Sequence, residues 1–141
     1  MTATAQGGAL EVVTSYLERH DPRYLAENMA LDVVPDKRMR VGRSAVAAAV
    51  HDLTHGRFRD VDDTVTGVRA IDDEVVVEVT FTGRPVQGRW SGQVTDRRIT
   101  VRAAIVCRVV AGEIVTARLY YDAASLHRDL RDDLPNRTLT A

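Results

Sequence analysis

Hydrophobic residues in the first third of the chain recur at the spacing of a helix. Leu10, Val13 and Leu17 fall on one face with polar positions between them, which predicts a helix there. The same reasoning gives two more helices, separated by short extended pieces. In chain order, the predicted elements are a helix over 9–20, a short helix beginning at Asp21-Pro22, extended pieces at 32–36 and 39–41, and a helix capped by Ser44 that runs to about His55.

After Gly56 the pattern changes to alternation of apolar and polar residues, which is typical of strands with one buried face. The predicted strands are 61–71, 74–84, 97–110 and 113–122, and a last short helix is predicted over 123–131. Asp72-Asp73 and Ala111-Gly112 supply the turns of two hairpins. Helices followed by hairpins predict an α+β fold, with the helices packed on one side of the sheet.

The chain has the size of one domain. Its 141 residues fit the usual range for a single core, so one domain is predicted over residues 9–131. Residues 1–8, which end in two glycines, are expected to form a flexible leader, and residues 132–141 a tail.

Charge and cysteine content exclude several classes of function. Nineteen basic and twenty acidic residues give a net charge of −1, and no run of like charges suits a phosphate backbone, so we expect no nucleic-acid partner. The longest apolar stretch, 45–50, is too short to span a membrane. The single Cys107 excludes an internal disulfide and a thiolate metal site, and we expect a cytoplasmic protein.

No sequence motif points to a cofactor or a metal. A glycine-rich phosphate loop and a dinucleotide fingerprint are both missing, so no cofactor is implied. His51 and His55 have the spacing of a metal pair, but they lie opposite the apolar stripe of the predicted helix and lack the glutamate of an HExxH motif. We therefore expect both histidines on a solvated face, and no metal.

The parity of the last strands defines one apolar sheet face. Its members are Val75, Val77, Val79, Phe81, Ile99, Val101, Ala103, Ile105, Cys107, Val109, Val115, Ala117, Leu119 and Tyr121. The small Ala103 and Ala117 leave room at its centre, so the face forms either a filled core or an apolar cavity that admits a hydrophobic small molecule. The polar or amphipathic groups best placed to rim such a cavity are Tyr16, His20, Asp36 and Trp90.

Four phrases of the sequence carry a family resemblance. They are Tyr24-Leu25-Ala26-Glu27 leading to Asp32-Val33-Val34, the segment 41–46, the segment 79–83, and Gly112-Glu113-Ile114-Val115 through Tyr120-Tyr121-Asp122 with Leu126. In order and spacing the chain resembles the SnoaL-like polyketide cyclases of the nuclear transport factor 2-like superfamily over about residues 9–131. The resemblance implies a cone-like, curved, mixed or antiparallel sheet, with three N-terminal helices on its concave face and a short C-terminal helix.

Each standard catalytic set of these relatives lacks a member here. The resemblance places the acid of the cyclases and of the related epoxide hydrolases at Leu119, three residues before Asp122. The stretch 75–81, where the epoxide hydrolases carry an arginine and an aspartate, has no arginine. The oxyanion-hole acid of the ketosteroid isomerase-like enzymes falls on the strand that here carries Ala103 and Ala104. Asp122 itself is expected to cap the last helix.

Two positions implied by the resemblance remain as catalytic candidates. Asp36 lies near the carboxylate of isomerase-like members and would abstract a carbon-bound proton, while Tyr16 would donate a hydrogen bond to the resulting oxyanion. Trp90, Phe81, Ala103, Leu119, Tyr121 and His20 would bind the substrate. The outer sheet face carries Arg102, Arg118 and Tyr120, which we expect close together, and the resemblance implies a homodimer through that face.

These residues lead to one functional hypothesis with alternatives. The favoured one is a cofactor-independent cyclase or isomerase that transfers a proton on a hydrophobic, polyketide-like or terpenoid-like substrate. Because Leu119 replaces the family acid, a non-catalytic ligand-binding or dimeric scaffold protein is the main alternative, and an epoxide hydrolase-like enzyme is a further one. Fold alone does not decide between them.

Overall fold

The first helix is longer than the sequence predicts. A computed structural model describes residues 2–134, and in it α1 spans Thr2–Arg19. The helix therefore extends back from Ala9 through residues for which the sequence predicts a leader. Gly7 and Gly8 lower helix propensity by roughly 1 kcal/mol each, but they do not block the helical conformation as proline would.

The predicted second helix is wrong. Asp21 does cap a turn, since its Oδ1 accepts a hydrogen bond from the backbone N–H of Arg23, but the turn is a single 3-10 turn over Pro22–Tyr24. The chain then continues as strand β1 (Leu25–Val33). Met29 and Leu31 are both buried on this strand, which fits a period of two rather than the helical period that we assigned.

The third predicted helix is shorter and is capped differently. A 3-10 turn over Val34–Asp36 and the strand β2 (Arg38–Val41) precede it, and α2 spans Arg43–His51. Its N-cap is Gly42, whose φ of 102° only glycine adopts easily, rather than Ser44. A π-helical turn, Asp52–Gly56, follows α2.

Four long strands and a last helix complete the chain close to the predicted bounds. They are β3 (Phe58–Ile71), β4 (Glu74–Pro85), β5 (Ile99–Val110), β6 (Glu113–Tyr121) and α3 (Ala123–Leu130). The six strands form one mixed sheet in the order β2-β1-β6-β5-β4-β3, in which β1 pairs parallel to β6 and the other neighbours are antiparallel. The prediction that Asp122 caps α3 is confirmed, because its Oδ1 accepts a hydrogen bond from the backbone N–H of Ser125.

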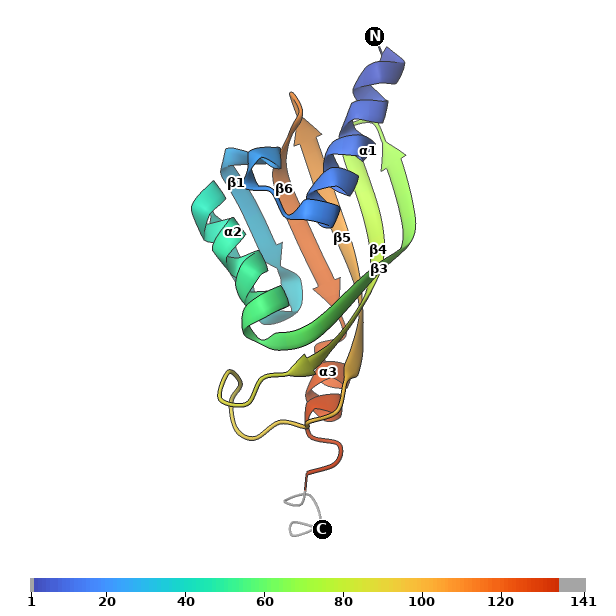
Figure 1. Ribbon diagram of the computed structural model, residues 1–141. Helices are drawn as coiled ribbons and strands as arrows, with labels where there is room; N and C mark the ends of the chain where they lie inside the picture. The colour runs from blue at the N-terminus through green and yellow to red at the C-terminus, as the bar shows by residue number, and fades with distance from the viewer. Residues whose placement is uncertain (1, 135–141) are drawn as a thin grey trace.

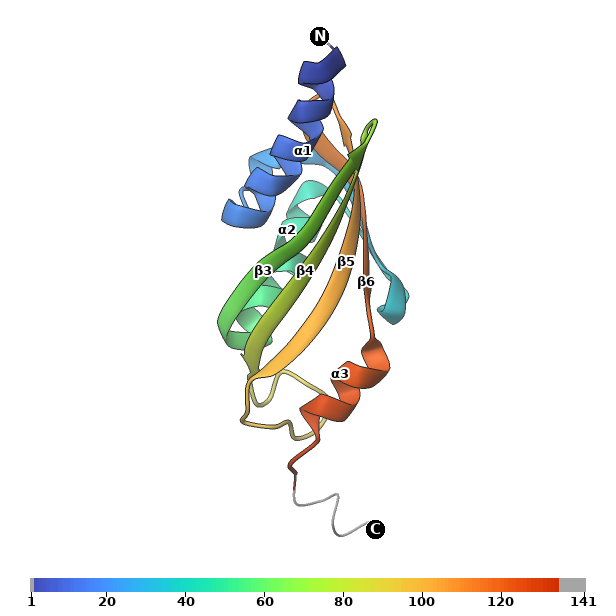
Figure 2. The same ribbon diagram turned by 90° about the vertical axis from the view of Figure 1, so that its right-hand side faces the viewer.

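Two helices, rather than three, cover the concave face of the curved sheet. Figures 1 and 2 show α1 and α2 on this side, whereas α3 lies on the other side, beyond the end of β6. The main core is made where α1 and α2 meet the sheet, with Val75 and Val77 both 0% exposed. A smaller cluster of Phe58, Val94, Ile99 and Leu130 joins the β4–β5 loop to α3. None of the described helices is long and apolar enough to cross a membrane.

The main core predicts a clear difference between two leucines. Leu25 is 0% exposed, whereas Leu10 on α1 is 37% exposed. We expect Leu25→Ala to lower the free energy of unfolding by about 2–5 kcal/mol, because it leaves a cavity among packed side chains. The same substitution at Leu10 should cost less than about 1 kcal/mol. Urea unfolding followed by circular dichroism measures both, and equal losses would contradict this description of the core.

Candidate functional site

The concave face is sealed at one end and accessible at the other. The sealed end consists of Val75, Val77, Cys107, Val109 and Ala117, all buried beneath the helices. At the open end, residues that share the same face remain half-exposed: Val79, Phe81, Val101, Ala103, Leu119 and Tyr121. A row of half-exposed apolar side chains on one face is a surface that an apolar ligand can cover.

Asp36 and Tyr121 meet at the open end. Tyr121 is the last residue of β6 and lies opposite Ala103, and its hydroxyl donates a 2.6 Å hydrogen bond to Oδ1 of Asp36. Asp36 is exposed at the end of the 3-10 turn that follows β1. Burial, followed by the bond to the Asp36 carboxylate, raises the pKa of Tyr121 well above its usual range. The phenol is therefore a stable donor to Asp36.

A guanidinium and an indole lie beside this pair. The guanidinium carbon of Arg57 lies 5.2 Å from the ring centroid of Trp90, and the indole N–H of Trp90 donates to the carbonyl oxygen of Arg57 at 3.2 Å. The positive charge of Arg57 slightly opposes the rise in the pKa of Tyr121. Arg57 is therefore close enough to Tyr121 to contribute to the electrostatics of the open end. Asp52 holds Arg57, with 3.3 Å between Oδ2 and Nε.

Tyr16 is a buried residue of α1, and its hydroxyl has no hydrogen-bond partner within residues 2–134. The residue is 8% exposed, and burial, with a smaller effect of Cys107, raises its pKa to about 12. Among the described residues, no hydrogen bond to the Tyr16 hydroxyl is present. Since a buried phenol normally finds a partner, this hydroxyl is a donor available to a ligand.

The other predicted binding residues lie in two groups. Ala103 and Leu119 are half-exposed on the concave face, and the half-exposed His20 places its ring centroid 5.5 Å from that of Tyr16. Phe81 and Trp90 instead pack against the edges of Phe58 in the smaller cluster. Both rings are half-exposed, and Phe81 also lies on the concave face, opposite Val101.

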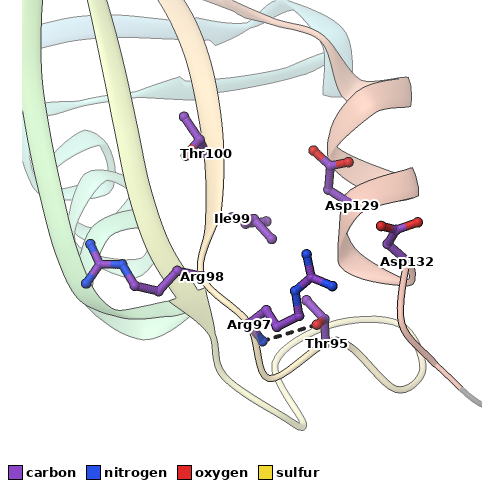
Figure 3. Close-up of a pocket in the computed structure, with 7 residues that line it drawn as sticks. All are labelled: Thr95, Arg97, Arg98, Ile99, Thr100, Asp129 and Asp132. Carbon is purple, nitrogen blue, oxygen red and sulfur yellow. Dashed lines mark hydrogen bonds between the residues drawn. The ribbon is translucent and has the colours of Figure 1, made fainter.

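Two hollows lie away from this site. One of about 250 Å³ is lined by Thr95, Arg97, Arg98, Ile99, Thr100, Asp129 and Asp132. Figure 3 shows Arg97 reaching toward Asp129 of α3 and Asp132, which follows α3, while Arg98 points away from them. The second hollow, of about 410 Å³, lies between the outer side of β5 and α3. Neither of them is lined by a predicted site residue.

Comparison with known proteins identifies the family. The family profile described as SnoaL-like polyketide cyclase matches residues 8–130. The chain belongs to the SnoaL-like polyketide cyclase family. No curated protein sequence matches this SnoaL-like protein.

Solved structures have the same fold at low sequence identity. A protein of Jannaschia sp. CCS1, named for its likeness to SnoaL-like polyketide cyclases, is 13% identical with a TM-score of 0.78, over 89% of this chain and 93% of the other. An M. tuberculosis LEH-like epoxide hydrolase is 17% identical with a TM-score of 0.69, over 96% and 98%. A Catenulispora acidiphila protein with a ketosteroid isomerase-like fold, in complex with trimethylamine, is 19% identical with a TM-score of 0.69, over 85% and 92%.

Leu119, Cys107 and the histidine pair of the SnoaL-like protein differ in burial. Leu119 faces the concave side, opposite Ile105 and Val33. Cys107 is buried as predicted, and burial raises the pKa of its thiol to about 12. His51 and His55 are exposed as predicted, with their rings stacked at 5.0 Å.

Sequence reasoning missed two charged residues near the open end, Arg57 and Asp63. Arg57 follows the π-helical turn, which has no sequence signature that we used. Asp63 lies opposite Phe81 on the concave side of β3. The predicted strand began at residue 61 and gave no sign of an irregularity in β3, so the side to which Asp63 belongs could not be derived.

The raised pKa of Tyr16 predicts a pH dependence of stability. An unfolded tyrosine ionises near pH 10.0 and the folded one at about 12, so the contribution of protonated Tyr16 is fully present below pH 10 and is lost as the pH rises from 10 to 12. In Tyr16→Phe, the free energy of unfolding should therefore fall less steeply over this range. Urea unfolding at pH 9 to 12 measures the slope. The exposed Tyr120→Phe is the control and should keep the wild-type slope.

Proposed function

We propose that this protein is a cofactor-independent enzyme that transfers a proton on a small hydrophobic substrate at the open end of the concave face. The 2.6 Å hydrogen bond from Tyr121 to Asp36 carries the proposal. It holds a carboxylate beside half-exposed apolar residues, where a carbon acid would bind. The second oxygen of Asp36, Oδ2, has no hydrogen bond or ion pair within residues 2–134, so it is available as a base.

Asp36 and Tyr16 would divide the chemistry between them. The carboxylate of Asp36 removes a proton from the carbon next to a carbonyl group, and the electron pair moves toward the carbonyl oxygen. The hydroxyl of Tyr16, unpartnered among the described residues and with a pKa of about 12, donates a hydrogen bond to the oxyanion without losing its own proton. The enolate then reprotonates or attacks a second carbonyl, which gives isomerisation or cyclisation. A polyketide-like or terpenoid-like substrate suits this chemistry.

A ligand-binding protein without catalysis is the second candidate, and Leu119 favours it. Leu119 occupies the position at which the resemblance places the acid of the cyclases, and it makes this part of the concave face apolar. In this case the open end would hold a hydrophobic molecule without converting it. The proton-transfer assay below separates the two candidates.

The assay uses 5-nitrobenzisoxazole, an apolar probe whose elimination needs only a base. Removal of its ring C–H proton forms the nitrile, breaks the N–O bond and releases a coloured phenolate. We expect turnover by the wild-type protein and a fall in kcat of about 10²-fold in Asp36→Asn, because the amide is not a base. The control Asp32→Asn lies opposite Met39 on the outer face and should keep wild-type kcat.

Two outcomes would decide against catalysis by Asp36. Equal rates for the wild type and Asp36→Asn would remove the assignment of Asp36 as the base. A wild-type protein that binds the probe in a fluorescence titration but releases no phenolate would favour the ligand-binding candidate.

A homodimer through the outer sheet face is a second part of the proposal. This face exposes large apolar side chains, namely Met39 at 56%, Val41 at 64% and Tyr120 at 40%. We expected Arg102 and Arg118 to lie close together, but this prediction is wrong. Arg118 lies opposite Val106, which is four residues along β5 from Arg102. Tyr120 lies opposite Ala104, between these two arginines along the outer face, and a symmetric contact between two copies would bury its ring at the centre.

Self-association can be tested with a charge placed at its centre. We expect Tyr120→Glu to convert a dimer into a monomer, because two copies of the new carboxylate would meet near the symmetry axis. Sedimentation velocity measures the mass of each form. Ile71→Glu is the matched control, since Ile71 is exposed at the β3–β4 turn. A wild-type monomer, or a loss of the dimer in both variants, would contradict the proposal.

A further inference from the structure

Three aspartates near the start of β3 differ in their partners. Asp60 Oδ2 lies 3.8 Å from Nε of Arg84, and Asp62 Oδ2 accepts a 2.9 Å hydrogen bond from Arg98. The carboxylate of Asp63 has no hydrogen bond or ion pair within residues 2–134. One carboxylate of the three is therefore not used by the fold.

A β-bulge turns Asp63 toward the concave face. Arg59 lies opposite Arg84 and Asp62 opposite Thr82, so β3 carries one residue more than β4 at this point. Asp60, within the bulge, has a φ of 54°. Because sides alternate along a strand, the extra residue moves Asp63 from the outer face to the concave face, opposite Phe81. Bulges often redirect a side chain in this way next to active sites.

His20 reaches the same region from the end of α1. It has a left-handed φ of 51°, and its backbone N–H donates to the carbonyl oxygen of Tyr16 at 2.6 Å. This conformation costs a non-glycine residue roughly 1 kcal/mol. It holds the imidazole beside the Tyr16 ring. Neither ring nitrogen has a hydrogen bond in the described part of the chain.

The π-helical turn contributes a third titratable group. Both α1 and this turn contact β3, and His55 lies close enough to act on the charges of His20 and Asp63. His55 itself is occupied, because its Nδ1 shares a 2.8 Å hydrogen bond with the hydroxyl of Thr54 and its ring stacks on His51. His20 and Asp63 are thus the two groups of this region that are left for a ligand.

We propose that His20 and Asp63 form an acid–base pair in which the imidazolium of His20 returns a proton to the substrate and Asp63 is its positioning residue. The inference rests on the proposed function, since it adds the second proton transfer that an isomerisation needs. Asp36 takes a proton from one carbon, and His20 gives a proton to another. The two groups are then reset by exchange with water, so that the protons balance.

The charges around His20 set the pH at which it can act as an acid. Burial lowers the pKa of His20, the charge of Asp63 opposes that fall, and His55 adds to it. Burial and the charge of Asp62 raise the pKa of Asp63, while His20 and His55 lower it. The negative charge of Asp63 therefore stabilises the imidazolium form of His20. Because burial lowers the pKa of His20, the imidazolium is available as an acid at a pH below the ordinary pKa of histidine.

The first experiment measures this pair without a substrate. Histidine ring resonances are followed by ¹³C-edited NMR between pH 4 and 8. In Asp63→Asn the pKa of His20 should fall below the wild-type value, because the imidazolium loses its neighbouring carboxylate. Asp60→Asn is the matched control, since the Asp60 carboxylate lies against Arg84, and it should leave the His20 titration unchanged. Equal shifts in both variants, or no shift in Asp63→Asn, would overturn the pair.

The second experiment separates proton return from proton removal. Isomerisation of 3-cyclohexenone to 2-cyclohexenone needs both steps, because a proton leaves C2 and another is added at C4. Elimination of 5-nitrobenzisoxazole needs only removal. We expect His20→Asn, which tolerates the left-handed conformation, to lower kcat for isomerisation at least tenfold more than kcat for elimination. Asp63→Asn should move the alkaline limb of the isomerisation profile to lower pH.

The outcomes distinguish failure of this inference from failure of the proposed function. Wild-type protein that eliminates but does not isomerise, or a His20→Asn variant that slows both reactions equally, would overturn proton return by His20. A wild type inactive on both probes would overturn the proposed function itself. In that event, the NMR titration still decides whether Asp63 controls the charge of His20.

Discussion

The rest of the structure depends on how far the helices cover the concave sheet face, where α1 packs on β3 to β6 and α2 packs on β1 and β2. Where they cover it, Val75 and Val77 are fully buried, and this end supplies most of the apolar burial that stabilises the fold. Where they do not, apolar residues such as Ala103 and Leu119 stay half-exposed. The same sheet face thus forms the core at one end and, at the other, the half-exposed apolar surface on which the proposed site lies.

The polar groups of the open end are held by local features of the backbone rather than by the core. Asp36 lies on the 3-10 turn after β1. His20 follows α1 and has a left-handed backbone conformation. Asp63 faces the concave side because of the bulge in β3. Each of these features interrupts a regular element at its edge. A site built in this way can change its side chains with little effect on the sealed end, which is consistent with one fold that hosts many chemistries.

Features set by residues close together in the sequence could be predicted, whereas features set by residues far apart in the sequence could not. Strand parity depends on neighbours two residues apart, so the faces of β4 and β5, the face of β6 from Ala117 onward and the position of Cys107 followed from the sequence. The prediction was wrong at Val115, because a register shift in β6 places Ile114 opposite Val109 on the buried face instead. The second helix was mispredicted because Leu25 and Met29 fit a helical period, whereas parallel pairing with β6, far along the chain, makes this segment a strand. The side of Asp63 could not be predicted, since one inserted residue reverses it.

The positions of the polar groups limit how a substrate could lie in the proposed site. The hydroxyl of Tyr121 is committed to Asp36 by a 2.6 Å bond, so it orients the carboxylate and is a poor choice for the oxyanion donor. The Tyr16 hydroxyl lies toward the sealed end, where the charge of Cys107 acts on it, and a carbonyl oxygen that reaches it must point inward. In the proposed reaction, the reacting carbons would therefore lie nearer the mouth, between Asp36 on the β1 side and His20 with Asp63 on the β3 side. Because the strand order places β1 and β3 on opposite sides of the central strands, a proton taken by one group and returned by the other would move across the substrate.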